Sequence, residues 1–134
     1  MKRLMILVSV AVILALLGPS AGAFTMAQKV IVAGQLVAVP RVSAGGFTAQ
    51  QRSNQVNDRL AYILGYERLC PRDINAKLAP GDSRAIMVGN KLLITVTPKD
   101  ARANKTTVAK LTDEWLKRAR SALPQARPTI CTVG

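Results

Sequence analysis

Short apolar runs open the part of the chain that follows residue 24. Residues 29–32 and 36–39 are rich in β-branched and apolar side chains, and Gly34-Gln35 stands between them. A pair of this kind, with glycine first, predicts the turn of a β-hairpin. Pro40 then ends the second strand or marks it as an edge strand, because proline donates no hydrogen bond to a sheet.

Helical spacing follows. Between residues 49 and 64 the apolar side chains recur three and four positions apart, which predicts an amphipathic helix. Thr48 stands where an N-cap is expected, and Gln51 completes a capping box with it. Gly65 predicts the end of the helix. The apolar stripe consists of Val56, Leu60, Ile63 and Leu64.

Three more strands are predicted over residues 74–78, 85–88 and 91–97. Residues 80–82, with the sequence Pro-Gly-Asp, provide one turn between them, and Gly89-Asn90 provides a second, glycine-first turn. The third strand is apolar at both odd and even positions, which suits a central strand that is covered on at least one face.

A second amphipathic helix closes the pattern. Residues 98–101 predict a short helical turn, and Thr106 or Thr107 is expected to cap a helix over residues 108–123. Pro124 is expected to end this helix, because proline lacks the donor that continues it. Its apolar stripe consists of Val108, Leu111, Trp115, Ala119, Ala122 and Leu123.

The predicted order is therefore β-β-α-β-β-β-α, which indicates an α+β fold. We expect a mostly antiparallel sheet of four to five strands, with the two amphipathic helices packed on one face. The other face would be solvated or paired.

The first 23 residues have the pattern of a cleavable signal peptide. Lys2 and Arg3 precede an apolar run over residues 4–17, Gly18-Pro19 breaks it, and small residues follow at 21–23. The alternative is an uncleaved membrane anchor, for which the run is shorter than the roughly 20 residues that a spanning helix needs. No later segment is apolar enough to span a membrane. We therefore expect export to the periplasm, a thylakoid lumen or the medium, with a single domain over residues 24–127.

Two cysteines, Cys70 and Cys131, lie outside the signal peptide. Their even number and an oxidising compartment favour a disulfide, with two unpaired thiols as the alternative. The bond would close a loop of about 60 residues, which corresponds to about 4 kcal/mol in the chain-entropy model. It would tether a C-terminal tail over residues 128–134.

Charge adds a second expectation. Without Lys2 and Arg3 the 19 basic residues fall to 17 against 7 acidic ones, so the mature chain carries +10. Such a domain could meet an anionic lipid, a cell-wall polymer or an acidic partner, although ordinary solvated charge explains the same count. The candidate residues for an anion-binding or partner-binding surface are Arg52, Arg59, Lys110, Lys117, Arg118 and Arg120.

Alternatives stay open for these side chains. Arg52 and Arg59 lie largely off the apolar stripe and share a helix face, where they either contact a partner or pair with Asp58 or Asp100. Glu114 and Arg118 have the spacing of a surface ion pair, as do Asp113 and Lys117.

Most catalytic classes lack their residues here. The chain contains no histidine, which removes the commonest general base and a usual metal ligand. Two thiols without histidine make a poor zinc site, and no phosphate-binding or dinucleotide-binding glycine motif occurs. We therefore expect no enzyme activity, no metal, no cofactor and no nucleic acid as partner.

Three segments resemble a known bacterial domain. They are residues 46–60, which include GFTAQQR and VNDRL, residues 86–101 (IMVGNKLLITVTPKDA), and residues 106–123, which include Trp115. The chain is similar over residues 30–123 to the extracytoplasmic N-terminal domain of small-conductance mechanosensitive channel-like proteins, notably those of cyanobacteria. The resemblance implies a fold and a compartment, and it implies no catalytic residues. No pore segment follows in this chain, so we expect the domain without the channel.

Two functions remain after these exclusions. The first is an exported, non-enzymatic interaction or accessory domain that binds an envelope protein. The second is a basic surface that binds an anionic lipid or a cell-wall polymer.

Overall fold

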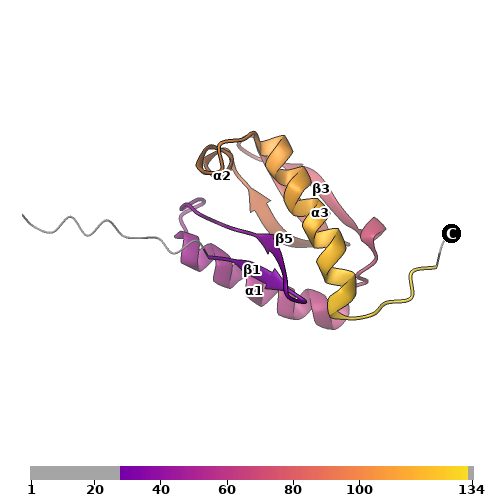
Figure 1. Cartoon of the computed structure of the whole chain (residues 1–134). Coiled ribbons are helices and arrows are strands. Elements are labelled where there is room, and N and C mark those ends of the chain that lie inside the picture. Colours follow the sequence, from indigo (N-terminus) through magenta and orange to yellow (C-terminus); the bar gives the residue numbers. More distant parts are fainter. Residues whose placement is uncertain (1–27, 133–134) are drawn as a thin grey trace, which may run out of the picture.

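The computed structural model describes residues 28–132. They form an α+β fold, which confirms the predicted class and the predicted order of the main elements (Figure 1). A 3₁₀ turn, η1, and a short helix, α2, complete that order. The bounds are β1 Val30–Val32, β2 Gln35–Ala38, α1 Ala49–Tyr66, η1 Pro71–Asp73, β3 Ile74–Ala79, β4 Ser83–Val88, β5 Lys91–Val96, α2 Pro98–Ala103 and α3 Val108–Ala126.

All five strands pair in antiparallel fashion, but they form two sheets rather than the one sheet that the pattern predicts. β1 pairs only with β2, and the other three strands form a sheet in the order β3-β4-β5. β5 is therefore an edge strand and β4 the central one, which corrects the expectation for residues 91–97. The apolar positions of β5 are explained by α1 and α3, which both contact it.

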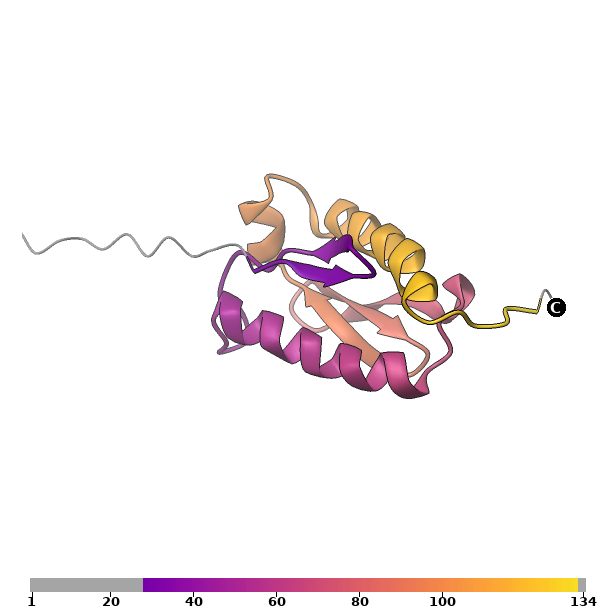
Figure 2. The same cartoon turned by 60° about the horizontal axis from the view of Figure 1, so that its bottom comes forward.

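Both long helices pack against the three-stranded sheet, as predicted. α1 contacts β5, whereas α3 runs across β3 and β4. The β1–β2 hairpin lies between the two helices, with the three-stranded sheet behind it (Figure 2). It buries Val30, Val32 and Val37 there, and this burial replaces pairing with the other sheet.

One core joins these elements. The predicted stripes of both helices are buried, apart from Leu64 and Val108, which are partly exposed and pack against the cluster. Trp115 is the largest fully buried side chain and comes from the middle of α3. It packs in one cluster with buried residues of both sheets, such as Ile74, Ile86 and Leu93.

The capping box that the sequence predicts for α1 is present. Thr48 Oγ1 accepts a hydrogen bond from the Gln51 amide, and Gln51 Oε1 accepts one from the Thr48 amide. Gly65 does not end this helix: it is helical, and the cap is Glu67. Thr107, one of the two predicted candidates, caps α3.

Two other boundaries differ from the prediction. The first hairpin turns at Ala33-Gly34, one residue earlier than expected, with φ of 49° and 75° at the two positions. A turn with positive φ at both central residues matches the twist of the strands that it joins. Pro124 lies inside α3, which continues to Ala126 because proline fits the helical φ and the buried Leu123 holds the last turn against the core.

Membrane-spanning character is not found in the part of the chain that the structure describes, since no helix there is long and apolar enough. The predicted signal peptide, residues 1–23, lies outside the described residues.

Candidate functional site

A buried ion pair joins α1 to α2. Arg52 Nη1 and Nη2 each donate to one carboxylate oxygen of Asp100, at 2.7 Å in both cases. Arg52 is 7% exposed and Asp100 is fully buried. A two-point contact of this kind fixes both planes and is among the strong hydrogen bonds in proteins.

The remaining donors and acceptors of this pair are also occupied. Arg52 donates to the carbonyls of Val42 and Thr95, at 2.8 and 3.1 Å. Asp100 Oδ2 accepts from the amide and hydroxyl of Thr97, so the same carboxylate completes the capping box of α2. The pair therefore ties the loop before α1, the end of β5 and α2 together.

Arg52 is thus a structural residue. Of the alternatives predicted for Arg52, pairing with Asp100 is confirmed, and the side chain is buried although it lies off the apolar stripe of α1. Of the two carboxylates that the sequence offered for Arg52 and Arg59, Asp100 is paired, and Asp58 takes part in no ion pair within residues 28–132.

Arg59 lies two turns further along α1 and performs a related role. Its Nη1 donates to the Leu93 carbonyl at 3.3 Å, as Arg52 donates to the Thr95 carbonyl. Leu93 and Thr95 belong to the edge strand β5, whose free backbone groups would otherwise offer a template for another strand. The two arginines of α1 therefore cover this edge.

A groove runs between α1 and β5, with Arg59 at its middle. It consists of two pockets of about 230 and 310 Å³ that share the Arg59 side chain. Phe47, 42% exposed, lines the first pocket. Tyr62 lines the second pocket together with Lys91, whose ammonium lies 5.1 Å from the centre of the Tyr62 ring. We call these two pockets together the α1–β5 groove.

A third aromatic ring, that of Tyr66, packs beside Tyr62. The rings of Tyr62 and Tyr66 lie 4.9 Å apart, and the two side chains are 47% and 77% exposed. Tyr62, Tyr66 and Lys91 are not among the binding residues that the sequence predicts. The signal that could have found the tyrosines is their spacing of four residues on α1, away from its apolar stripe.

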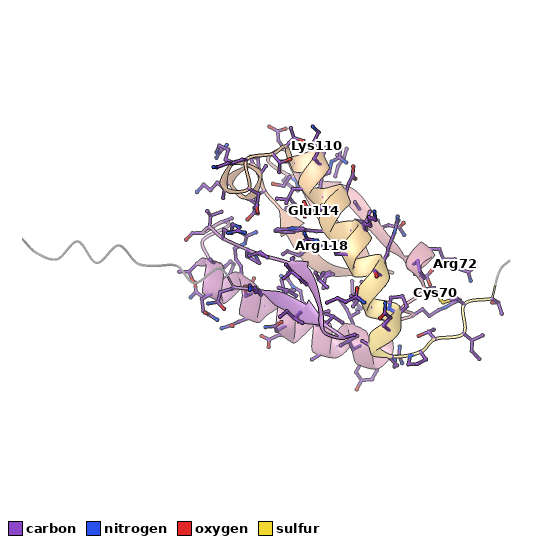
Figure 3. The ribbon with its side chains drawn as sticks, viewed as in Figure 1. Cys70, Arg72, Lys110, Glu114 and Arg118 are labelled. Carbon is purple, nitrogen blue, oxygen red and sulfur yellow. A yellow bond between two sulfur atoms is a disulfide. The ribbon has the colours of Figure 1, made fainter. Side chains whose placement is uncertain are left out.

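The four cations predicted on α3 do not form one patch. Lys110 and Lys117 are exposed. Arg118 pairs with Glu114, as its spacing predicts (Figure 3). Arg120 lies towards β3 and donates to the Ile74 carbonyl at 2.8 Å. The second expected ion pair, between Asp113 and Lys117, does not form.

The predicted disulfide is confirmed. Cys70 and Cys131 are bonded, with their Cα atoms 5.7 Å apart, and they lie 61 positions apart in the sequence. Cys70 is fully buried at the start of η1, and Arg127 donates to the carbonyls of Gly65 and Glu67 near the same place. The segment after α3 is therefore fixed at two points to the segment after α1.

Metal-ligating side chains do not gather in groups of three or more within residues 28–132. Cations meet aromatic rings in the α1–β5 groove, and this arrangement is suited to binding.

Comparison with known proteins adds one relationship. No curated protein and no solved structure matches this chain. One family model, described as a domain of unknown function (DUF8459), matches residues 29–126. This range includes every helix and strand of residues 28–132. The chain therefore belongs to the DUF8459 family.

Proposed function

We propose that this protein is an exported, non-enzymatic interaction domain of the cell envelope, which binds an envelope protein through the α1–β5 groove. The observation that carries the proposal is the composition of this groove. The exposed rings of Phe47 and Tyr62 line it together with the cations Arg59 and Lys91, and the exposed ring of Tyr66 packs beside Tyr62. Tyrosine and arginine are the residue types that contribute most to binding at protein interfaces.

Charge in the groove favours one kind of partner. No acidic residue lines either pocket. Neither Arg59 nor Lys91 has a carboxylate within 4.0 Å among residues 28–132. A protein surface that presents carboxylates beside apolar side chains complements such a groove, because the ion pairs give specificity and the rings give buried area.

Export is supported by three independent features. Residues 1–23 have the charge, apolar run and small residues of a signal peptide. The Cys70–Cys131 disulfide suits an oxidising compartment. The resemblance to the extracytoplasmic domain of mechanosensitive channel-like proteins implies the same location.

A second candidate function is a basic surface that binds an anionic lipid or a cell-wall polymer. It is favoured by the number of cations without a carboxylate partner. Of the 17 basic residues among residues 28–132, only three form ion pairs. Of the candidate cations, however, Arg52 and Arg118 form ion pairs, and Arg120 donates to the Ile74 carbonyl. We therefore favour the groove.

Co-purification with two matched variants tests the proposal. The mature protein, immobilised, is incubated with a detergent-solubilised envelope fraction from its own cells. One variant carries Tyr62→Ala and Tyr66→Ala, which remove two exposed rings. The control carries Lys110→Ala and Lys117→Ala, which remove the exposed cations of α3. Both changes lie on the surface, so thermal unfolding of both variants should match the parent.

The two functions give opposite results. If the groove binds a protein, that protein is retained by the parent and by the α3 variant, and it is lost with the tyrosine variant. If the basic surface binds a lipid or a polymer, binding to vesicles or to peptidoglycan falls with the α3 variant and with added salt, because salt screens exposed charges. Equal retention of the protein by all three forms would overturn the groove as the binding site.

A further inference from the structure

The two edges of the three-stranded sheet differ. At β5 the outward carbonyls of Leu93 and Thr95 accept hydrogen bonds from the arginines of α1. At β3, the opposite edge, the Ile74 carbonyl is the only one with such a partner among residues 28–132, and this partner is Arg120 of α3.

The direction of the β3 backbone groups follows from this contact. The Ile74 carbonyl points away from β4, because it accepts from Arg120 on the far side. β3 pairs with β4 in unbroken register, and in an antiparallel pair the outward groups belong to alternate residues. The N–H and C=O groups of Ala76 and Leu78 therefore also point outward. No hydrogen bond to them from elsewhere in residues 28–132 is found.

This open stretch has defined limits. Arg120 occupies the edge at Ile74, and Pro80, which has no N–H, follows the strand. Between these limits Leu78 is 85% exposed, although it is the last apolar residue on the face that carries Ile74. An exposed strand edge with an apolar side chain is a site where proteins accept another strand.

A hollow adjoins the open stretch. It has a volume of about 620 Å³ and lies between the β3–β4 turn and the first turn of α3, with Leu78, Arg84 and Val108 in its lining. A second, smaller hollow of about 270 Å³ is lined by Ala76, Lys77, Leu78 and Arg84. Leu78 lines both hollows, so each adjoins the open stretch of β3.

The charge of this edge is positive. Lys77 and Arg84 form no ion pair and no side-chain hydrogen bond within residues 28–132, and one carboxylate, Asp82, lines the larger hollow. A second copy of this chain is a poor occupant. Antiparallel self-pairing of Ala76 with Leu78 would place the Lys77 side chains of both copies directly opposite each other, and like charges in that position destabilise a pair.

We propose that the β3 edge binds, by strand addition, an extended segment of another protein in which acidic and apolar residues alternate. The segment exchanges backbone hydrogen bonds with Ala76 and Leu78, places a carboxylate opposite Lys77, and packs an apolar side chain beside Leu78. Backbone pairing provides affinity and the alternate side chains provide specificity, as in other cases of strand addition. This site lies on the opposite edge of the sheet from the α1–β5 groove, and it stands independently of that groove.

A designed peptide provides the probe. The disulfide-bonded mature protein, labelled with ¹⁵N, is titrated with acetyl-Glu-Val-Glu-Val-Glu-amide and observed by NMR. The expected result is a shift of the amide signals of Ala76 and Leu78 and slower hydrogen exchange at both. A peptide with N-methylated valines, which cannot form the backbone ladder, should not cause these changes. A peptide with lysine in place of glutamate should bind more weakly.

Proline substitution tests the backbone contact from the side of the protein. Ala76→Pro and Leu78→Pro remove N–H groups that point away from β4, so the β3–β4 ladder stays intact. Together they should weaken binding of the acidic peptide about tenfold, because two ladder donors are lost. Leu78→Ala keeps the donors and should weaken it less. Lys77→Glu should reverse the preference between the acidic and the basic peptide.

Several results would overturn the proposal. They are the absence of shifts at Ala76 and Leu78 up to millimolar peptide, equal binding of the N-methylated peptide, and shifts confined to the α1–β5 groove. A dimer in sedimentation analysis that the Leu78→Pro change abolishes would also overturn it, since the edge would then bind a second copy. If the proline variants fail to fold, the comparison with the N-methylated peptide still decides.

Discussion

Breaking the buried pair of Arg52 and Asp100 should cost the domain much of its stability. Replacing Asp100 with asparagine keeps the size of the side chain and removes its charge, so Arg52 stays buried with no counterion. Arg52 is 7% exposed and its guanidinium makes four hydrogen bonds, two of them to Asp100. Removal of one partner from a buried pair costs about 3–5 kcal/mol, and we expect Asp100→Asn to fall at about 3 kcal/mol.

A double-mutant cycle measures the same pair directly. Arg52→Met fills much of the same space without charge, and the double variant removes both charges at once. The free energies of unfolding lost in the two single variants should therefore add up to more than the loss in the double variant. We expect the difference, the coupling energy, to be about 2 kcal/mol. Urea unfolding with the disulfide intact, followed by circular dichroism, gives each free energy of unfolding.

The chain provides a matched control for this cycle. Arg118 and Glu114 also form an arginine–carboxylate pair, but both side chains are exposed. Their replacement by alanine should couple by only about 0.3–0.5 kcal/mol, as expected of surface pairs four residues apart. A loss below about 1 kcal/mol for Asp100→Asn, comparable to a surface pair, would refute the reasoning.

Three further predictions concern the ends and turns of the chain. Mass spectrometry of the native protein should show a mature chain that begins at Phe24, and a retained Met1 would contradict the signal peptide. Replacing Cys70 and Cys131 together with alanine should lower the free energy of unfolding by about 4 kcal/mol, and a change below about 1 kcal/mol would argue against a stabilising tether. Ala33→Asn should raise the stability by about 1 kcal/mol, because asparagine tolerates the positive φ of this turn better than alanine. Thermal unfolding checks it, and a loss of stability would mean that the Ala33 side chain matters more than its φ.

Local signals in the sequence were sufficient for the elements. The capping box of Thr48 and Gln51 acts within four residues, and the apolar stripes repeat within a few turns, so each could be identified without knowledge of the fold. The disulfide followed from compartment and cysteine count. The predicted position of the first turn is one residue too late, because the prediction puts glycine first in the turn. In the structure the turn residues are Ala33 and Gly34, with glycine second.

Long-range choices were not visible in the sequence. The division into two sheets depends on whether the β1–β2 hairpin pairs with other strands or packs between α1 and α3, and both options bury the same valines. The Arg52–Asp100 pair joins residues 48 positions apart, so the sequence could offer Asp100 only as one of two alternatives. β5 looked like a central strand because α1 covers it, and a covering helix leaves the same apolar pattern as a neighbouring strand.

The arginines of α1 connect these two levels. Arg52 and Arg59 looked like candidates for partner binding, because cations off an apolar stripe are usually exposed. In the structure they donate hydrogen bonds to the Thr95 and Leu93 carbonyls at the β5 edge. At the β3 edge, within residues 28–132, Arg120 donates to the Ile74 carbonyl alone. Two side chains thus occupy one edge of the three-stranded sheet, and the other edge is open between Arg120 and Pro80. The proposed strand addition therefore has one available edge of this sheet. The choice of a partner at this edge depends on Lys77, Leu78 and Arg84, whereas Arg59 of α1 belongs to the separate α1–β5 groove.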